Sequence, residues 1–243
     1  MESFLKVVIL AGGKGKRLWP YLGLKPFLRV GSSSSLLQMT VDRFSNPWIL
    51  TSRELEKRTR SELPETEVLV EPQSLNTGPA VLFALDQLTT NEDDLFCFVP
   101  CDHYFGDVEH LLEKLNEGLE FARSGNIVLF GVKPSCADTG YGYILKDSFV
   151  EKPDIEKANR LIEEGALWNT GIFLFAAKTV RDLVDRAPTE AISFDHMVLE
   201  KCNKLHCIEL TTEWCDLGTW DRIHAFLGGI KADGVNSKEL SIQ

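Results

Sequence analysis

Short apolar runs alternate with longer amphipathic segments along the first half of this chain, a pattern typical of alternating strands and helices. The strands expected from the apolar runs are Lys6–Leu10, Pro47–Thr51, Glu67–Val70, Leu95–Val99 and Ile127–Phe130. The helices expected between them are Leu36–Phe44, Arg53–Glu62, Thr77–Leu88 and Val108–Arg123. Such alternation predicts βαβ units. We therefore expect an α/β fold with a Rossmann-like, mostly parallel sheet flanked by helices.

The regular alternation of predicted strands and helices ends after Phe130. Two short strands separated by Lys146 and Asp147 predict a small β-hairpin. The remaining elements expected are strands Tyr143–Leu145, Ser148–Val150, Gly171–Phe175 and Leu205–Leu210, a helix that Asp154 caps and that runs to Glu164, and helices Thr179–Arg186 and Phe194–Asn203. No linker interrupts the pattern, so we expect one domain over residues 1–227. The polar, glycine-containing segment 228–243 is expected to be a mobile tail.

Composition narrows the class of protein. The chain has 243 residues, of which 44% are hydrophobic and 26% charged, as in ordinary globular domains. A net charge of −10 disfavours nucleic-acid binding, which requires a basic face. No apolar run is long enough to span a membrane, and the first strand begins too early to leave room for a signal peptide. We therefore expect a cytoplasmic protein that does not bind a membrane.

The six cysteines do not indicate a disulfide framework, because such frameworks belong to small secreted chains. Cys97 and Cys101 are expected to be small buried residues. Cys202, His206 and Cys207 invite a zinc interpretation. A structural zinc ion needs four ligands, however, and this spacing matches no standard zinc motif, so we disfavour zinc here.

A glycine-rich loop follows the first strand and includes Gly12, Gly13 and Gly15, with the cations Lys16 and Arg17 directly after it. Exposed N–H groups in such a loop can cradle phosphates, although a simple turn with solvated cations explains the same residues. A P-loop would require glycine in place of Leu10, and a dinucleotide fingerprint would require a small residue in place of Leu18. The loop is therefore a phosphate binder of another kind, or none.

Two aspartates far apart in sequence are candidate metal ligands. Asp102 directly follows the carboxyl end of a predicted strand, where ligands bind in open α/β sheets. Asp216 lies in a second acidic stretch near the end of the chain. A pair of carboxylates with phosphate oxygens and waters suits magnesium, although either residue alone also fits an ordinary turn. Asn76 or Thr77 could cap the helix that follows, and capping alone explains these residue types.

Several of these stretches together resemble the sugar-phosphate nucleotidyltransferases, and their mannose-1-phosphate guanylyltransferase branch in particular. The similarity begins at Ala11–Pro20, with the sequence AGGKGKRLWP. The further matching stretches, in the family's order, are Lys25–Leu28, Glu71–Ala80, Pro100–His103, Thr139–Ile144, Phe149–Pro153, Trp168–Phe173 and Trp214–Trp220. This chain departs from the family pattern at Leu75, Gly78 and Cys101, and in a short segment before Lys25. The resemblance implies a nucleotidyltransferase domain, similar in fold to the glycosyltransferase-A proteins.

The resemblance also implies roles for individual residues. The catalytic set would be Arg17, Lys25, Asp102 and Asp216, of which Asp102 and Asp216 would hold Mg²⁺ or another divalent cation. The nucleotide would be bound by Ala11, Gly12, Gly13, Gly15, Lys16, Arg17, Glu71, Asn76, Thr77 and Asp102. The sugar phosphate would be bound by Lys25, Gly142, Glu151, Lys152, Asn169 and Thr170. The segment around Asp195 would be mainly architectural.

The activity implied by this resemblance is transfer of GMP from GTP to α-D-mannose 1-phosphate, which gives GDP-mannose and pyrophosphate. Two alternatives remain open: a nucleotidyltransferase for another pair, such as glucose 1-phosphate with UTP, and a catalytically silent subunit that binds a nucleotide sugar. The chain is expected to lack the C-terminal β-helix or isomerase domain that relatives often carry. A homodimer is considered, although no motif specifies the oligomeric state.

Overall fold

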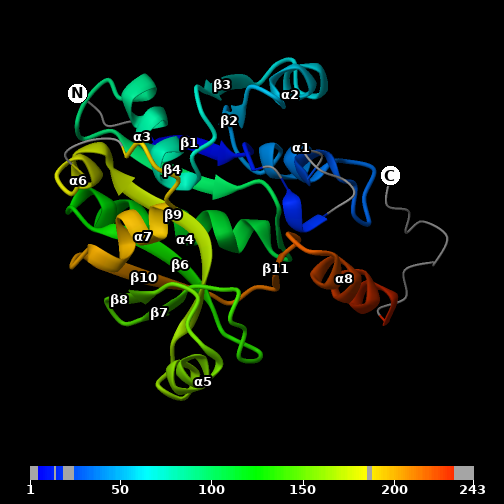
Figure 1. Ribbon diagram of the computed structural model, residues 1–243, viewed down its shortest axis with the longest axis vertical. Helices are drawn as coiled ribbons and strands as arrows, with labels where there is room; N and C mark the ends of the chain where they lie inside the picture. Colours follow the sequence, from blue (N-terminus) through cyan, green and yellow to red (C-terminus); the bar gives the residue numbers. More distant parts are fainter. Residues whose placement is uncertain (1–4, 14, 19–24, 185–187, 233–243) are drawn as a thin grey trace. The chain divides into compact units, whose positions relative to one another are not determined.

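The computed structural model describes residues 5–13, 15–18, 25–184 and 188–232 (Figure 1). Within these residues the protein is a mixed, mostly parallel sheet with helices packed on it, as the sequence predicts. The chain divides into two compact units. Unit 1 comprises Met1–Val8, Ser74–Val99 and Asp107–Thr212, and unit 2 comprises Ile9–Gln73, Pro100–Gly106 and Glu213–Gln243. Strands β1 (Leu5–Leu10) and β4 (Leu95–Pro100) each begin in unit 1 and end in unit 2.

Unit 1 is built on strands in the order β10-β6-β9-β4-β1. Its further strands are β6 (Ile127–Val132), β7 (Tyr143–Leu145), β8 (Ser148–Val150), β9 (Leu167–Ala176) and β10 (Leu205–Leu210). Strand β10 is parallel to β6, whereas β9 runs antiparallel to both β6 and β4. The predicted hairpin of β7 and β8 is confirmed, and β7 adds to the edge of β9.

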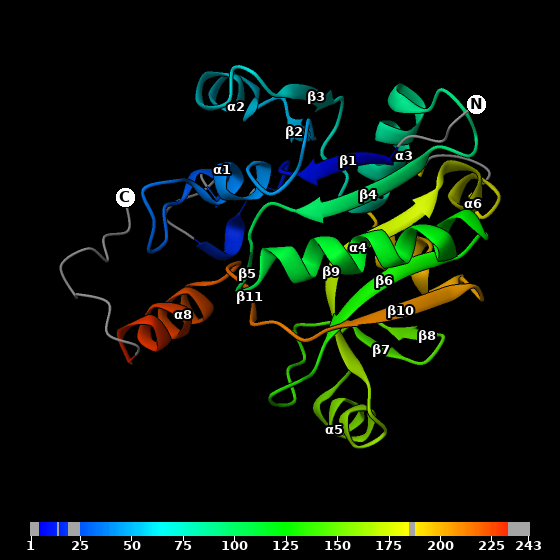
Figure 2. The ribbon, with the colours of Figure 1, turned by 180° about the vertical axis from the view of Figure 1, so that it is seen from behind.

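The helices of unit 1 cover both faces of its sheet. They are α3 (Thr77–Leu88), α4 (Val108–Arg123), α5 (Ile155–Glu163), α6 (Ala177–Arg181), α7 (Phe194–Met197) and the short 3₁₀ helix η3 (Leu199–Lys201). Figure 2 shows α4 lying across β6, β9 and β10. Gly118 of α4 packs against Leu174 of β9, whereas Phe194 of α7 stacks on the next residue, Phe175. Because successive strand residues face opposite sides, α4 and α7 cover opposite faces.

Unit 2 contains the strand order β1-β2-β3, with β2 (Trp48–Ser52) parallel to β3 (Glu67–Glu71). Its helices are η1 (Lys16–Leu18), η2 (Lys25–Phe27), α1 (Leu36–Val41), α2 (Glu56–Glu62) and α8 (Trp220–Ala232). Two short strands, β5 (His103–Phe105) and β11 (Trp214–Asp216), form a separate antiparallel pair.

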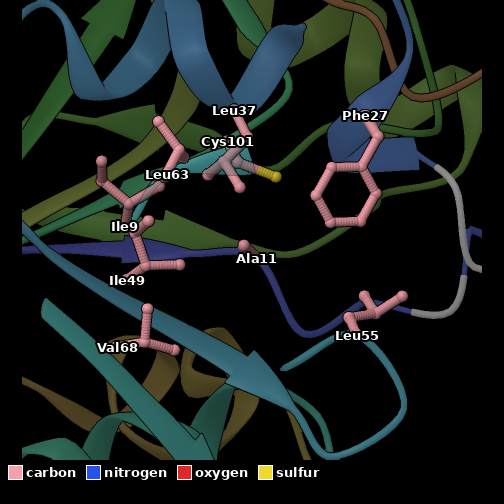
Figure 3. Packing of buried hydrophobic residues seen from close by; sticks show 9 residues of the cluster. All are labelled: Ile9, Ala11, Phe27, Leu37, Ile49, Leu55, Leu63, Val68 and Cys101. Carbon is pink, nitrogen blue, oxygen red and sulfur yellow. The ribbon is translucent and has the colours of Figure 1, made fainter. Parts of the chain in front are cut away.

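A hydrophobic cluster fixes the end of β1 in unit 2, directly before the glycine loop. The cluster consists of Ile9, Ala11, Phe27, Leu37, Ile49, Leu55, Leu63, Val68 and Cys101 (Figure 3). These side chains come from strands β1 to β3, from η2 and α1, and from the segments beside α2 and β4. Figure 3 labels Leu37 and Cys101 as members of this cluster, and Cys101 is buried as predicted. Ala11 and Cys101 belong to this cluster, so the packing fixes the chain directly before the glycine loop and directly before Asp102.

Several boundaries differ from the sequence-based expectation. Helix α8 continues to Ala232, so residues 228–232, which were assigned to the tail, are helical. The predicted helix Phe194–Asn203 is broken into α7 and η3 at Val198, whose φ is −121°. Strands β5 and β11 were not predicted. The end of the expected helix Thr179–Arg186, Lys14, residues 19–24 and the tail from 233 onward lie outside the described residues.

The structure explains other features of the sequence. All six cysteines are free, and His206 stacks on Phe121 with 3.6 Å between ring centroids. Asp154 caps α5, as predicted, by accepting a hydrogen bond from the N–H of Lys157. Among the described residues, no helix combines the length and the apolar character that a bilayer crossing requires.

The packing around Leu37 yields a stability prediction. Leu37 is fully buried, so Leu37→Ala should leave a cavity and lower the free energy of unfolding by about 2–5 kcal/mol. The matched control is Leu112→Ala on α4, where the leucine is 40% exposed and the change should stay within about 0.5 kcal/mol. Urea unfolding of both variants measures the difference. Equal midpoints for the two variants would show that the cluster does not support the fold.

Candidate functional site

The glycine loop of unit 2 begins where β1 ends. The N–H of Ala11 donates to the carbonyl of Leu50 at 2.8 Å, which extends the sheet contact into the loop. Gly12 lies so close to Glu71 that a Cβ at this position would be 2.6 Å from the carboxylate Oε1. Gly15 has a φ of 58°, in the left-handed region that glycine adopts readily. A side chain at position 12 would therefore displace the Glu71 carboxylate, and the backbone conformation at position 15 favours glycine.

The loop ends in η1, which contains Lys16 and Arg17. The N–H of Leu18 donates to the carbonyl of Gly15 at 2.9 Å and closes this turn. The side chain of Arg17 is exposed, whereas Leu18 is fully buried and anchors the turn. The side chain of Lys16 lies outside the described residues. Arg17 is thus held beside the loop on a buried base, with its guanidinium directed to solvent.

The two predicted metal ligands, Asp102 and Asp216, come together in unit 2. The pairing of β5 with β11 sets Asp216 opposite His103, the residue directly after Asp102. The N–H of Leu217 also donates to the carbonyl of Asp102 at 2.9 Å. One ligand atom each from Asp102, His103 and Asp216 lie within 4.8 Å of one another. Both aspartates are only 8% exposed, so two carboxylates share a small buried space.

Each of these carboxylates pairs with a cation of the same unit. Lys25 forms an ion pair with Oδ2 of Asp102, and Arg222 of α8 forms one with Oδ2 of Asp216. Burial alone would lower the pKa of Lys25, but the charges of Asp102 and Asp216 outweigh it and raise that pKa above its ordinary value. Burial likewise opposes ionisation of Asp102, yet Lys25 and His103 hold its pKa well below the usual range. Lys25 and Asp102 are therefore both charged at neutral pH.

The space between these groups is tight. A Cβ on Gly218 would lie 2.5 Å from Oδ1 of Asp216 and 3.1 Å from Nζ of Lys25. Lys25, which directly follows a segment outside the described residues, is therefore next to Asp216 as well as Asp102. The His103 ring packs edge-on against Trp214 at 5.4 Å between centroids, and its Nε2 lies 4.0 Å from Oδ1 of Asp216.

This carboxylate pair fits a divalent cation. Oδ1 of Asp216 is buried and accepts no hydrogen bond from the described residues, so one ligand oxygen faces the cluster without a donor. Hard cations such as Mg²⁺ prefer carboxylate oxygen, and they usually take one or two carboxylates with the rest of the shell from water and phosphate. Asp102 and Asp216 supply that donor set. His103 supplies a nitrogen, which suits Mg²⁺ less well.

Glu71 is the remaining nucleotide candidate in unit 2. It ends β3 and is 6% exposed, with its carboxylate against the backbone of Gly12. Asn76 and Thr77 belong to unit 1 and act there as structural residues. The Asn76 side chain caps α3 at a φ of 72°, and the Thr77 hydroxyl accepts from the N–H of Phe194 at 2.9 Å. Asn76 is thus the helix cap, whereas the Thr77 hydroxyl joins the start of α3 to α7.

The sugar-phosphate candidates other than Lys25 gather in unit 1. A Cβ on Gly142 would lie 2.9 Å from Oε2 of Glu151, and the N–H of Asn169 donates to the carbonyl of Gly142 at 2.8 Å. Glu151, whose side chain is 6% exposed, pairs with the neighbouring Lys152. Lys152 has a φ of 44°, which is uncommon for a residue with a side chain. Strain of this kind is frequent at binding sites.

Thr170 does not fit the role that the resemblance implies for it. Its side chain is fully buried, and its hydroxyl donates to the carbonyl of Phe130 at 2.6 Å. The hydroxyl is therefore committed to the contact between β9 and β6. Asn169, the neighbouring residue, faces the opposite side of the strand and is available to the Glu151 cluster.

Two residues of these clusters were not identified from the sequence. Asp195 of α7 accepts from Nδ2 of Asn169 at 3.4 Å, although its segment was interpreted as architectural. Burial, and then the negative charge of Glu151, raise the pKa of Asp195 to about 7. Arg222 likewise matches no motif that we considered. The available signals were weak: an acidic residue in the first turn of one helix, and a cation in the first turn of another helix.

Comparisons with known proteins show the family to which the chain is similar. The family model described as nucleotidyl transferase matches residues 6–230. A mannose-1-phosphate guanylyltransferase of Klebsiella pneumoniae is 29% identical over 89% of this chain and 58% of its own length. The alginate biosynthesis protein AlgA of Pseudomonas aeruginosa is 30% identical over 89% of this chain and 57% of its own. The chain thus spans somewhat more than half the length of the curated relatives it matches.

A solved structure is also similar to this chain. A protein of Thermus thermophilus, described as a mannose-1-phosphate geranyltransferase, superimposes with a TM-score of 0.83 at 28% sequence identity. The match covers 91% of this chain and 79% of that one. With the family model matching nearly the whole chain, and the glycine loop and paired aspartates in place, this chain belongs to the nucleotidyl transferase family.

Proposed function

We propose that this chain transfers the GMP group of GTP to α-D-mannose 1-phosphate, giving GDP-mannose and pyrophosphate. The observation that carries the proposal is the convergence of Asp102 and Asp216 in one buried cluster of unit 2. The choice of substrates is supported by relatives that are named mannose-1-phosphate guanylyltransferases. A homodimer and a cytoplasmic location stay predictions of the sequence.

The reaction has a simple bond balance. An oxygen of the sugar phosphate attacks the α-phosphorus of GTP and forms a new P–O bond. The bond from the α-phosphorus to the bridging oxygen of the β-phosphate breaks, and pyrophosphate leaves with that electron pair. Both reactants are anions, so positioning and charge compensation provide most of the rate enhancement. No covalent intermediate with the protein is required.

Each residue of unit 2 then has an electrostatic task. Asp102 and Asp216 would hold Mg²⁺, which supplies neutralising charge and polarises phosphate oxygens when bound. Lys25, charged and mostly buried, would compensate the negative charge at the reacting phosphates. Arg17 would neutralise the departing pyrophosphate, since its guanidinium is exposed beside the glycine loop.

Glu71 offers a physical reason for the choice of guanine. Glu71 is buried beside the loop and its carboxylate oxygens are hydrogen-bond acceptors, so the part of the nucleotide near it would be one that donates hydrogen bonds. Guanine presents two neighbouring donors, N1–H and the N2 amino group, which a carboxylate can accept together. Uracil and thymine present a single N–H between two carbonyl oxygens, and those oxygens would face the carboxylate unfavourably. Glu71 would therefore favour GTP over UTP or dTTP.

The cluster in unit 1 would hold the sugar. Glu151 and the backbone at Gly142 would contact hydroxyls, and Lys152 would contribute a positive charge for the sugar's phosphate. The Asn169 amide is oriented at both ends, because its Oδ1 accepts from the N–H of Gly171 at 3.1 Å and its Nδ2 donates to Asp195. One Nδ2 hydrogen is left to donate to a hydroxyl. Asp195 thus sets the direction of that amide.

The first prediction about activity tests the reaction itself. Pyrophosphate release should be fastest with GTP and mannose 1-phosphate when GTP, UTP, ATP and dTTP are each combined with mannose 1-phosphate and glucose 1-phosphate. Asp216→Ala should lower turnover about 10²-fold or more, because one electrostatic stabiliser is lost. The matched control is Asp221→Ala on α8, an exposed aspartate for which turnover should stay normal.

These outcomes separate the alternatives. A preference for UTP and glucose 1-phosphate would replace the proposed substrates while keeping the chemistry. Absence of pyrophosphate release with every pair, together with binding of GDP-mannose, would establish a silent binding subunit instead. Near-normal turnover of Asp216→Ala would remove the metal assignment.

The second prediction concerns base selection. Glu71→Gln replaces one acceptor by a donor, so kcat/KM with GTP should fall about 10–100-fold, the effect of losing one hydrogen bond to a charged group. The value with UTP should be unchanged or higher. Glu67→Gln, an exposed change at the other end of β3, serves as the control. If Glu71→Gln lowered both values equally, Glu71 would support the loop without selecting the base.

The third prediction uses the raised pKa of Asp195. As the pH rises through about 7, Asp195 loses its proton and adds a negative charge beside Glu151, where the anionic substrate must bind. The KM for mannose 1-phosphate should therefore rise between about pH 6 and 8, on the order of fivefold for roughly 1 kcal/mol of added repulsion. The KM for GTP should not show this step.

Asp195→Asn should remove the step, and the difference between the two enzymes cancels the titration of the substrate's own phosphate. Asp147→Asn, an exposed change in the turn between β7 and β8, should keep it. A step of the same size in Asp195→Asn would assign it to another group.

A further inference from the structure

The cations that pair with Asp102 and Asp216 bear directly on how a metal ion enters the site. Lys25 bonds Oδ2 of Asp102, and Arg222 bonds Oδ2 of Asp216. The four side chains are between 11% and 18% exposed, so water screens these pairs only weakly. Two negative and two positive charges give a formal sum of zero. The protein therefore already compensates the carboxylates that would attract a divalent ion.

Arg222 is held in this place by its helix. It lies in the first turn of α8, and the next residue, Ile223, is 1% exposed within a cluster that also contains Leu217. The N–H of Arg222 donates to the Thr219 hydroxyl at 3.4 Å. The buried Ile223 fixes the backbone of this turn, and the Arg222 guanidinium pairs with Asp216. The guanidinium can therefore move away from Asp216 only by rotation of the Arg222 side chain. The ion pair is thus built into the helix start.

A guanidinium and a divalent cation compete for the same carboxylate. The guanidinium pairs with Oδ2 of Asp216 and leaves Oδ1 for the cation, so two positive charges would share one carboxylate and repel one another. Displacing the guanidinium from Asp216 breaks their ion pair and therefore costs free energy. A triphosphate solves this problem, because its oxygens accept hydrogen bonds from a guanidinium in the same bidentate way as a carboxylate.

We propose that Arg222 competes with the divalent cation for Asp216, so that the cation binds tightly only together with a nucleoside triphosphate that accepts the displaced guanidinium. The proposal rests on the function proposed above, since it takes Asp102 and Asp216 as the metal ligands. Coupling of this kind is reciprocal: the triphosphate strengthens cation binding by the same factor as the cation strengthens triphosphate binding. Arg222 is then a positioning residue that changes partners during substrate binding.

The test is direct binding of Mn²⁺ to the full chain, followed by electron paramagnetic resonance of the free ion. Without nucleotide, the wild-type chain should bind Mn²⁺ weakly, and Arg222→Gln should bind it about 10-fold more tightly, within the usual range of such couplings. Arg222→Lys, which keeps the charge, should lie between them. Arg60→Gln, which removes an exposed arginine paired with Glu56, is the matched control and should bind as the wild type does.

The second arm measures coupling through the nucleotide. A fluorescent GTP analogue with a methylene bridge between the α- and β-phosphates is titrated with and without Mn²⁺. The tightening that Mn²⁺ causes should be large in the wild type and about 10-fold smaller in Arg222→Gln. Thermal melting of each variant verifies that it is folded before its affinities are compared.

The outcomes distinguish this proposal from the proposed function. If Arg222→Gln and the wild type bind Mn²⁺ equally without nucleotide, the competition is refuted while the metal site stands. If neither binds Mn²⁺ even with the analogue, or if Asp216→Ala binds it as well as the wild type, the metal assignment itself is refuted. Tight nucleotide-free binding by the wild type would also overturn the proposal.

Discussion

Two buried carboxylates that lie within a few ångströms of each other are the constraint on which unit 2 depends. Asp102 and Asp216 would repel one another unless cations were placed beside them, and isolated charges of this kind are costly to bury. Lys25 and Arg222 provide those cations from segments on either side in the sequence. Their positions in turn explain why residue 218 is glycine, because a side chain there would collide with Asp216 and crowd Lys25.

Unit 1 solves a related problem by other means. Glu151 and Asp195 are also acidic neighbours, but the cation that pairs with Glu151, Lys152, has a side chain that is 57% exposed. The cluster therefore reduces its charge by holding a proton on Asp195 near neutral pH. Unit 2 thus compensates its carboxylates with buried cations, whereas the protonated Asp195 of unit 1 suits contact with uncharged hydroxyls.

The parts of the fold that the sequence predicted well are those with strong local signals. Buried runs such as β4 and β6 and the whole of α3 and α4 match the expected elements closely, and Asp154 caps α5 as expected. The β5–β11 pair could not be predicted in the same way. Each strand has three residues with mixed polarity, and the register that sets Asp216 opposite His103 joins segments far apart in sequence.

The candidate site shows the same division between local and distant information. Motif similarity pointed to Asp102, Asp216 and Lys25, and the structure brings these three together. Thr170 was placed among the ligands for the same reason, yet its hydroxyl serves the sheet, because alternation along β9 turns it away from Asn169. Arg222 and Asp195 act through contacts with distant residues, and no pattern in their own neighbourhoods reveals such contacts.

A departure from the family pattern can also be explained by packing. Gly78 stands where relatives of the resembled branch carry alanine, and a Cβ here would lie 2.8 Å from the carbonyl of Ile192 and 3.1 Å from the sulfur of Met197. The N–H of Gly78 donates to that same carbonyl at 3.0 Å, which draws the Ile192 segment against α3. The close approach places α7, and with it Asp195, beside β9. The glycine is therefore linked through the backbone to the orientation of the Asn169 amide, and its effect on the sugar half is one of position.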